Sequence, residues 1–270
     1  MGSGIAQTCA AAGFNVLLME LADAPLRKGM AAIERSLDTF VTKQKLSAAD
    51  GAATLARIRP TTNVKDLKDC DLIIEAIIEN MDAKLALFGA LDDLLAPHAI
   101  ICSNTSSLCV IEMAAGTKRA DRIAGLHFFN PVPIMKLVEV VQTIATSKET
   151  LETVYAFAKT LGKDPVLAKD TPGFIVNRLL IPYLLYAIRI YEQGVASRED
   201  IDKSMKLGCG YPMGPLELLD FVGLDTTYYI AQIMFDELKD PIMAAPTLLR
   251  RMVVAGQFGR KSGKGFYDYD

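Results

Sequence analysis

Short β-rich runs alternate with helical stretches over the first 168 residues, and this alternation limits the chain to a small set of folds. A repeated strand, helix and strand is typical of an open parallel sheet with crossover helices. The expected strands lie at residues 15–20, 72–76, 100–103, 123–129, 137–141 and 165–167. The expected helices lie at residues 3–12, 24–43, 48–58, 83–95 and 148–161. We therefore expect the first part of the chain to be an α/β domain.

The alternation stops at Asp170-Thr-Pro-Gly173, and the rest of the chain forms helical stretches separated by glycine and proline. We therefore place residues 1–169 in the sheet domain and residues 170–270 in an all-α domain. The apolar faces of this second domain exceed what one small core needs. A homodimer interface is the expected use of the surplus.

The charge balance and the cysteine pattern exclude several classes of partner. The net charge is −3 and both signs are interleaved, so there is no basic field for a nucleic acid. The longest apolar stretch, residues 174–191, is interrupted by Asn177, Arg178, Pro182 and Arg189, which favours a buried helix over a membrane span. None of the five cysteines forms a Cys-x-x-Cys pair, so no disulfide framework or metal site is expected. With no signal peptide visible, a cytoplasmic location fits best.

His127, one of two histidines, lies in an apolar run and is followed twelve residues later by Glu139. A carboxylate held against one imidazole nitrogen fixes the tautomer and raises the basicity of the ring. The other nitrogen can then take a proton from an alcohol. The alternative is a structural core histidine, with Glu139 as a surface acid at a strand edge. Ser103-Asn-Thr-Ser-Ser107 and Asn177 favour the catalytic interpretation.

A glycine-rich helix start, Gly2-Ser-Gly-Ile-Ala-Gln7, precedes Gly13 and a strand that ends in Glu20. In a dinucleotide-binding unit, a strand leads into Gly-x-Gly-x-x-Gly. The last glycine lets the helix pack on the strand, and an acid about twenty residues later binds the ribose. Gly2 would be that glycine and Glu20 that acid. These residues alone leave a plain Ala/Gly-rich helix start as an equal alternative.

Seven motifs spread along the whole chain carry a family resemblance. They are Met1-Gly-Ser-Gly-Ile-Ala-Gln7, Ile74-Glu-Ala-Ile-Ile-Glu-Asn80, Ser103-Asn-Thr-Ser-Ser107, His127-Phe-Phe-Asn-Pro-Val-Pro133, Lys136-Leu-Val-Glu-Val140, Asp170-Thr-Pro-Gly-Phe-Ile-Val-Asn-Arg178 and Gly210-Tyr-Pro-Met-Gly-Pro215. With them the chain resembles the 3-hydroxyacyl-CoA dehydrogenases, most of all the bacterial 3-hydroxybutyryl-CoA dehydrogenases. The resemblance implies a Rossmann-like doubly wound sheet followed by an all-α domain for substrate binding and dimerisation.

The resemblance also implies a reaction, the NAD-dependent interconversion of (S)-3-hydroxybutyryl-CoA and acetoacetyl-CoA in butyrate or fatty-acid metabolism. His127 would be the general base and Glu139 its orienting partner. Ser106 and Asn177 would hydrogen-bond the oxygen on C3 of the substrate. On spacing alone, Ser106 fits a helix cap and Asn177 an ordinary polar residue of a helix.

Contacts to the cofactor and to coenzyme A also follow from the resemblance. An acid at Glu20 favours NAD over NADP, because a carboxylate repels the 2′-phosphate. Ser36 and Lys43 lie seven residues apart, nearly two helical turns, so they share a face that could meet the nucleotide end of the acyl-CoA substrate. For Lys43 an exposed, solvated lysine is the alternative. The residues expected near NAD are Gly2, Glu20, Glu79, Lys84, Ser106, Asn130 and Lys261.

The chain departs from the family pattern at its beginning, since the first strand and the first two glycines would precede Met1. That strand lies in the middle of the sheet, so its loss is expected to leave a gap between its neighbours and to remove the backbone cradle for the pyrophosphate. We expect the natural gene product to carry roughly a dozen more residues upstream, the length of a strand and a turn.

Three other readings of the same sequence stay open. A β-hydroxyacid dehydrogenase acting on a free acid shares the two-domain plan but uses a lysine where this chain has Asn177-Arg178. A non-catalytic relative, as among lens crystallins, is the second. A fragment of a multifunctional fatty-acid oxidation protein is the third, and the family-like ending Gly265-Phe-Tyr267 disfavours it.

Overall fold

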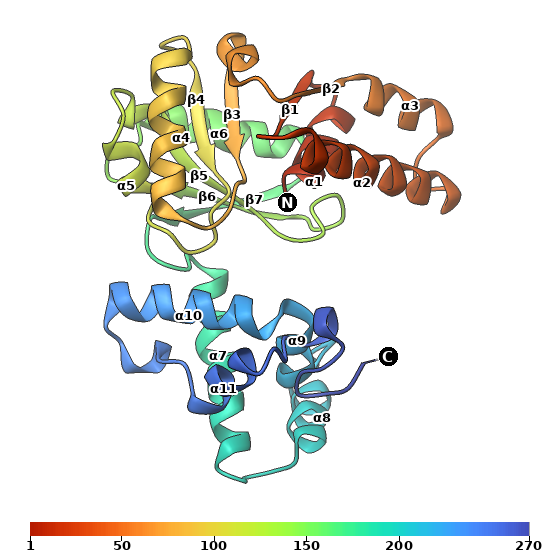
Figure 1. Cartoon of the computed structure of the whole chain (residues 1–270), viewed down its shortest axis with the longest axis vertical. Helices are drawn as coiled ribbons and strands as arrows, with labels where there is room; N and C mark the ends of the chain where they lie inside the picture. Colours follow the sequence, from red (N-terminus) through yellow and green to blue (C-terminus); the bar gives the residue numbers. More distant parts are fainter. Residues whose placement is uncertain (270) are drawn as a thin grey trace. The chain divides into compact units, whose positions relative to one another are not determined.

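The computed structural model describes residues 1–269 and divides the chain into two compact units (Figure 1). Unit 1 comprises Met1–Thr105 and Cys109–Asp170, and unit 2 comprises Ser106–Leu108 and the chain from Thr171 onward. The boundary between Asp170 and Thr171 lies one residue beyond the one expected from the sequence. The short segment Ser106–Leu108 was not expected to group with the helical part.

Unit 1 has the expected alternation of strands and helices. Its elements are α1 (Gly2–Ala11), β1 (Val16–Met19), α2 (Asp23–Thr42), α3 (Ala48–Ala56), β2 (Ile58–Thr61), the 3-10 helix Val64–Asp69, β3 (Leu72–Glu75), α4 (Met81–Leu94), β4 (Ile100–Ser103), α5 (Val110–Ala115), the 3-10 helix Ala120–Arg122, β5 (Ile123–Phe128), β6 (Leu137–Gln142), α6 (Lys148–Thr160) and β7 (Asp164–Lys169). Figure 1 shows α4 and α6 on opposite faces of the sheet. This arrangement is the Rossmann-like layer structure that the sequence predicts.

Two expectations about the strands are wrong. The sequence predicted a helix through residue 58, but α3 ends at Ala56 and Ile58 begins β2, which was not expected. Its Pro60 is tolerated because β2 pairs only with β1 and so lies at a sheet edge. The sheet is also not wholly parallel, since β6 runs antiparallel to β5. The link between residues 128 and 137 is shorter than the dozen or so residues that a parallel crossover needs.

The strands form two separate sheets, with orders β1-β2 and β3-β4-β5-β6-β7. The expected gap in the sheet is therefore present, and it separates the β1–β2 pair from β3. Helix α1 packs on both parts. Its Ile5 and Cys9 join the apolar cluster of the larger sheet, whereas Ala6 and Ala10 join the cluster that contains β1 and β2. Residues on two adjacent stripes of one helix thus hold the two sheets in one unit.

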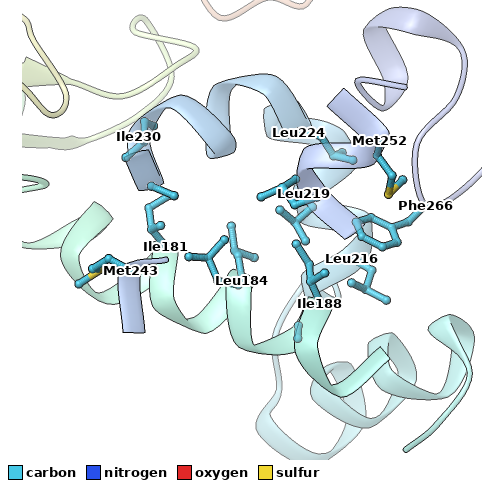
Figure 2. Close-up of a cluster of buried hydrophobic side chains, with 14 of the residues drawn as sticks. Ile181, Leu184, Ile188, Leu216, Leu219, Leu224, Ile230, Met243, Met252 and Phe266 are labelled. Atoms are coloured by element: carbon cyan, nitrogen blue, oxygen red, sulfur yellow. The ribbon is translucent and has the colours of Figure 1, made fainter. Parts of the chain in front are cut away.

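Unit 2 is helical, as expected. Its elements are α7 (Val176–Glu192), α8 (Arg198–Cys209), α9 (Pro215–Val222), α10 (Leu224–Leu238), the 3-10 helix Pro241–Met243, α11 (Thr247–Val254) and the 3-10 helix Arg260–Ser262. Figure 2 shows its core, in which Ile181, Leu184 and Ile188 of α7 lie among apolar side chains of α9 and α10. Their spacing of three and four residues places them on one face of α7. Within residues 1–269, no helix is both long and apolar enough to span a membrane.

Two buried aspartates fix the end of unit 2. Asp202 accepts hydrogen bonds from the backbone N–H groups of Leu216 and Glu217 at 2.8 and 2.9 Å and so caps α9. Asp220 accepts from the backbone N–H groups of Phe266 and Tyr267, both at 2.8 Å. The backbone at Phe266 and Tyr267 is therefore hydrogen-bonded to α9.

Candidate active site

His127 and Glu139 form a buried pair in unit 1. Their side chains are 8% and 0% exposed, and Nδ1 of His127 lies 2.7 Å from Oε2 of Glu139. The two residues are direct partners in the antiparallel register of β5 and β6. Because directly opposed side chains in such a pair lie on the same face of the sheet, the fold itself brings the carboxylate to the ring. Glu139 is thus not the surface acid of the alternative interpretation.

This geometry suits acid–base chemistry. A carboxylate that accepts from Nδ1–H fixes the neutral tautomer with Nε2 as the basic nitrogen, and it stabilises the imidazolium that forms on proton uptake. The ring also lies 4.5 Å, centroid to centroid, from the Phe129 ring. The imidazole is therefore oriented by one charged and one apolar neighbour.

Ser106 and Asn177 come together in unit 2. Asn177 lies in the first turn of α7 and is 9% exposed, and its Nδ2 donates to the backbone oxygen of Ser106 at 3.2 Å. Helix α5 follows this segment in the chain. Asp170 caps it by accepting from the backbone N–H groups of Val110 and Ile111 at 2.9 and 2.6 Å. Asn177 is therefore more than an ordinary polar residue of a helix, because its amide holds the Ser106 segment.

Glu20 and Gly2, which are expected near a dinucleotide, lie after the carboxyl end of β1 and at the start of α1. Glu20 directly follows the carboxyl end of β1, where its side chain is exposed. The expectation that Gly2 lets α1 pack on a preceding strand stays a prediction, but the space around the glycines of α1 can be compared. A Cβ at Gly2 would come no closer than 4.0 Å to Ala76, whereas at Gly4 it would lie 3.1 Å from Val132. Gly4, which the sequence analysis did not single out, is the position of close approach.

Glu79 and Lys84, expected near the cofactor, form an ion pair with 3.3 Å between Nζ and Oε2. Lys84 is also paired with Glu75, a residue that the sequence analysis missed. The available signal was an acid at the end of the apolar strand Leu72-Ile-Ile-Glu75, because an acid in a buried strand needs a partner.

Ser36 and Asn130 line one hollow of about 160 Å³, together with Gly4, Gln7 and other residues of unit 1. Its wall at Val132 is held by Lys163, whose Nζ donates to the backbone oxygens of Val132 and Met135 at 2.5 and 2.8 Å. Residues expected for coenzyme A and for NAD thus share one hollow. Lys43 is exposed at the C-cap of α2 and is not among its lining residues.

The remaining site candidate, Lys261, lies in unit 2. Its Nζ donates to Oδ2 of Asp225 on α10 at 2.7 Å. The second histidine, His98, has a side chain that is 66% exposed and lies 3.2 Å from Asp71. His98 is therefore a surface residue, as expected, and a natural control for His127.

Comparison with known proteins decides the family. The family description "3-hydroxyacyl-CoA dehydrogenase, NAD binding domain" matches residues 1–171, and "3-hydroxyacyl-CoA dehydrogenase, C-terminal domain" matches residues 173–269. The chain belongs to the 3-hydroxyacyl-CoA dehydrogenase family. Members of this family are oxidoreductases, and the predicted family is confirmed.

Several relatives of this dehydrogenase are similar over the whole of this chain and most of their own length. The mitochondrial hydroxyacyl-coenzyme A dehydrogenase of Sus scrofa is 50% identical, with 100% of this chain and 88% of the relative aligned. The 3-hydroxybutyryl-CoA dehydrogenase of Clostridioides difficile is 47% identical over 100% and 96% of the two chains. Among solved structures, the (S)-3-hydroxybutyryl-CoA dehydrogenase of Ralstonia eutropha is 46% identical with a TM-score of 0.96, over 100% and 95%.

The residues of this dehydrogenase fit a dinucleotide. Glu20 at the carboxyl end of β1 offers oxygens to ribose hydroxyls, and the N-terminus of α1 adjoins the hollow that contains Ser36 and Asn130. Ligands bind outside the carboxyl ends of the strands in open α/β sheets. His127, the fifth residue of the six-residue strand β5, is near such an end.

Proposed function

We propose that this enzyme interconverts 3-hydroxyacyl-CoA and 3-ketoacyl-CoA with NAD, and that (S)-3-hydroxybutyryl-CoA and acetoacetyl-CoA are a substrate pair. The observation that carries the proposal is the buried contact of 2.7 Å between His127 and Glu139 in a member of this family. The names of the relatives from C. difficile and R. eutropha support the short-chain substrate.

His127 is the general base in the direction of oxidation. Its Nε2 takes the proton of the C3 hydroxyl, while Nδ1 keeps its hydrogen bond to Glu139 and the carboxylate stabilises the imidazolium. Bound NAD supplies the acceptor for the hydride on C3. In the direction of reduction, the imidazolium returns the proton to the oxygen of the ketone.

Ser106 and Asn177 hold the substrate oxygen in this proposal. A hydroxyl and an amide are suited to the charge that develops on the C3 oxygen as the proton moves. The hydrogen bond from Asn177 to the backbone of Ser106 supports a shared role, because it fixes the segment that carries the hydroxyl.

The cofactor is NAD rather than NADP in this proposal, since Glu20 would repel a 2′-phosphate. Further cofactor contacts are assigned to Gly2, Glu79, Lys84, Ser106, Asn130 and Lys261. Ser36 and Lys43 are assigned to coenzyme A, and the place of Ser36 in the hollow supports this. The exposed position of Lys43 suits a contact to a phosphate that approaches from solvent.

We further propose a homodimer in the cytoplasm. Leu179 and Tyr186 lie seven residues apart on α7 and are 72% and 60% exposed, so one face of this helix presents an apolar stripe. Cys9, Cys70, Cys102 and Cys209 are free thiols, which suits a reducing compartment.

The activity is tested by the loss of NADH absorbance on addition of acetoacetyl-CoA. We expect His127→Gln to lower kcat by roughly 10²–10⁴-fold, the usual contribution of a general acid or base. His98→Gln replaces the other histidine and should retain full activity. An inactive parent protein, or a His127→Gln variant as fast as the parent, would refute the assignment.

A further inference from the structure

Lys163 is a buried lysine of unit 1 that the proposed chemistry does not use. Its ammonium donates to two neutral acceptors, the backbone oxygens of Val132 and Met135, at 2.5 and 2.8 Å. Burial of an ammonium against neutral acceptors is costly. A costly buried charge next to a hollow of the molecule is a reason to look for a role in binding or catalysis.

The backbone of Lys163 is itself firmly held. Gly162 follows the end of α6 and has a φ of 69°, in the left-handed region. Its N–H donates to the oxygen of Lys159 at 2.9 Å, and the next N–H, that of Lys163, donates to the oxygen of Ala158 at 3.3 Å. These two hydrogen bonds form a Schellman motif. Because β7 begins at Asp164, the side chain of Lys163 starts from a rigid corner between a helix and a strand.

The two acceptors of Lys163 belong to a turn in the link between β5 and β6. In this turn, residues 131–135, the N–H groups of Ile134 and Met135 both donate to the backbone oxygen of Pro131 at 3.0 Å. The ammonium contacts the second and the last residue of the turn. One side chain therefore fixes the 131–135 turn at two points.

The 131–135 turn forms one wall of the hollow that contains Ser36 and Asn130, and α1 and α2 form the others. Val132 is buried, and a Cβ at Gly4 of α1 would lie 3.1 Å from it. The turn thus packs closely against the first turn of α1. Since Lys163 holds the carbonyl of Val132, it also fixes how the turn meets α1 and how wide the hollow is.

We propose that Lys163 is a positioning residue for the cofactor, which holds the 131–135 turn in the place where Asn130 meets NAD. The proposal rests on the proposed function, in which Asn130, directly before the turn, is assigned to NAD. His127 is outside this arrangement, because the pairing of β5 with β6 already fixes its strand. Lys163 therefore governs the affinity for the cofactor and leaves the proton transfer unaffected.

Lys163→Met tests the proposal, because it keeps an unbranched apolar stem and removes the donors. The turn then adopts the binding position only part of the time, and the apparent affinity falls by that fraction. We expect the dissociation constant of NADH, measured by fluorescence titration, to rise by roughly ten- to hundredfold, the weight of a hydrogen bond to a charged group. With saturating NADH and acetoacetyl-CoA, kcat should stay within about twofold of the parent value, since only binding is weakened.

Lys136→Met is the matched control. Lys136 is exposed, and its ammonium donates to the backbone oxygen of Gly162 at 3.3 Å, so it joins the same link and the same corner from the solvent side. Its NADH dissociation constant should equal that of the parent. A merely structural role for Lys163 predicts instead that Lys163→Met loses kcat and resistance to urea together with its affinity.

A second measurement uses the unaltered protein and is independent of whether Lys163→Met folds. Saturating NADH should slow hydrogen exchange at the amides of Ile134 and Met135, because the ligand stabilises the wall that it contacts.

Three results would overturn the proposal. They are a folded Lys163→Met variant that binds NADH like the parent, an equal loss of affinity in Lys136→Met, or exchange in the 131–135 turn that NADH leaves unchanged. Failure of the proposed function would look different, since the parent protein would then bind no NADH.

Discussion

Lys163 brings a positive charge into the interior of unit 1, where two backbone carbonyls accept its hydrogen bonds. The residue is 6% exposed. Burial, aided by the nearby charge of Lys136, lowers the pKa of Lys163 below its ordinary value of 10.5. The charged form is therefore less favoured in the folded protein than in the unfolded chain.

This lowered pKa predicts the pH dependence of folding. Between the folded pKa and 10.5 the unfolded chain binds more protons at Lys163, so this residue makes stability rise with pH in that window. The slope cannot exceed that of one proton, about 1.4 kcal/mol per pH unit. Urea unfolding followed by circular dichroism should show that Lys163→Met lacks this rise. Lys148→Met, at a lysine that is 87% exposed, should keep it, and an equal loss in both variants would contradict the assignment.

At the scale of single residues, the sequence predicted the groups whose chemistry is visible in their type. A histidine in an apolar run twelve residues before an acid was enough to propose the pair of His127 and Glu139. Lys163 was missed because most Lys residues are exposed and nothing in the sequence marks this one as buried. Glu75 was missed although its place at the end of an apolar strand was a signal of burial. The distinction between Gly2 and Gly4 depends on the position of Val132, which only the folded loop provides.

Among the elements, α1 has the unusual task of packing on two sheets that share no hydrogen bonds. Every residue from Ile5 to Ala10 is buried. Its hold on the larger sheet depends on Ile5 and Cys9, since the neighbouring stripe of Ala6 and Ala10 faces the smaller one. Truncation of Ile5 is therefore expected to weaken the whole of unit 1.

We expect Ile5→Ala to destabilise the protein by about 2–5 kcal/mol, the usual cost of removing a buried isoleucine side chain. The matched control is Ile144→Ala, because Ile144 is 97% exposed and should change stability by less than about 0.5 kcal/mol. The chain has no tryptophan, so urea unfolding is best followed by circular dichroism. Equal effects of the two substitutions would show that α1 does not hold unit 1 together.

Sequence patterns predicted most helices and strands but missed one strand and the direction of another. Helices and long apolar strands were predicted because their periodicity extends over many residues. The strand β2 was missed because its four residues, Ile58-Arg-Pro-Thr61, contain a proline and show no alternation. The direction of β6 depends on the length of the link before it, which the sequence analysis did not use.

On the scale of the whole molecule, the proposed homodimer is the property most open to a direct test. We expect Leu179→Glu to shift the protein from dimer to monomer in sedimentation velocity, because a charge on the apolar stripe of α7 would have to be buried. Leu167→Glu makes the same change at a residue of unit 1 that is 56% exposed, and it should leave the dimer intact. A monomeric parent, or a Leu179→Glu variant that remains dimeric, would rule out this interface.

The grouping of Ser106–Leu108 with the helices has a consequence for how such enzymes can be recombined. A helical half exchanged at residue 171 would arrive without these three residues, and the incoming Asn177 would have to donate to the Ser106 carbonyl of the other parent. The set of residues that should be exchanged together is therefore discontinuous in the sequence. A chimera should be built with residues 106–108 and the chain from Thr171 taken from the same parent.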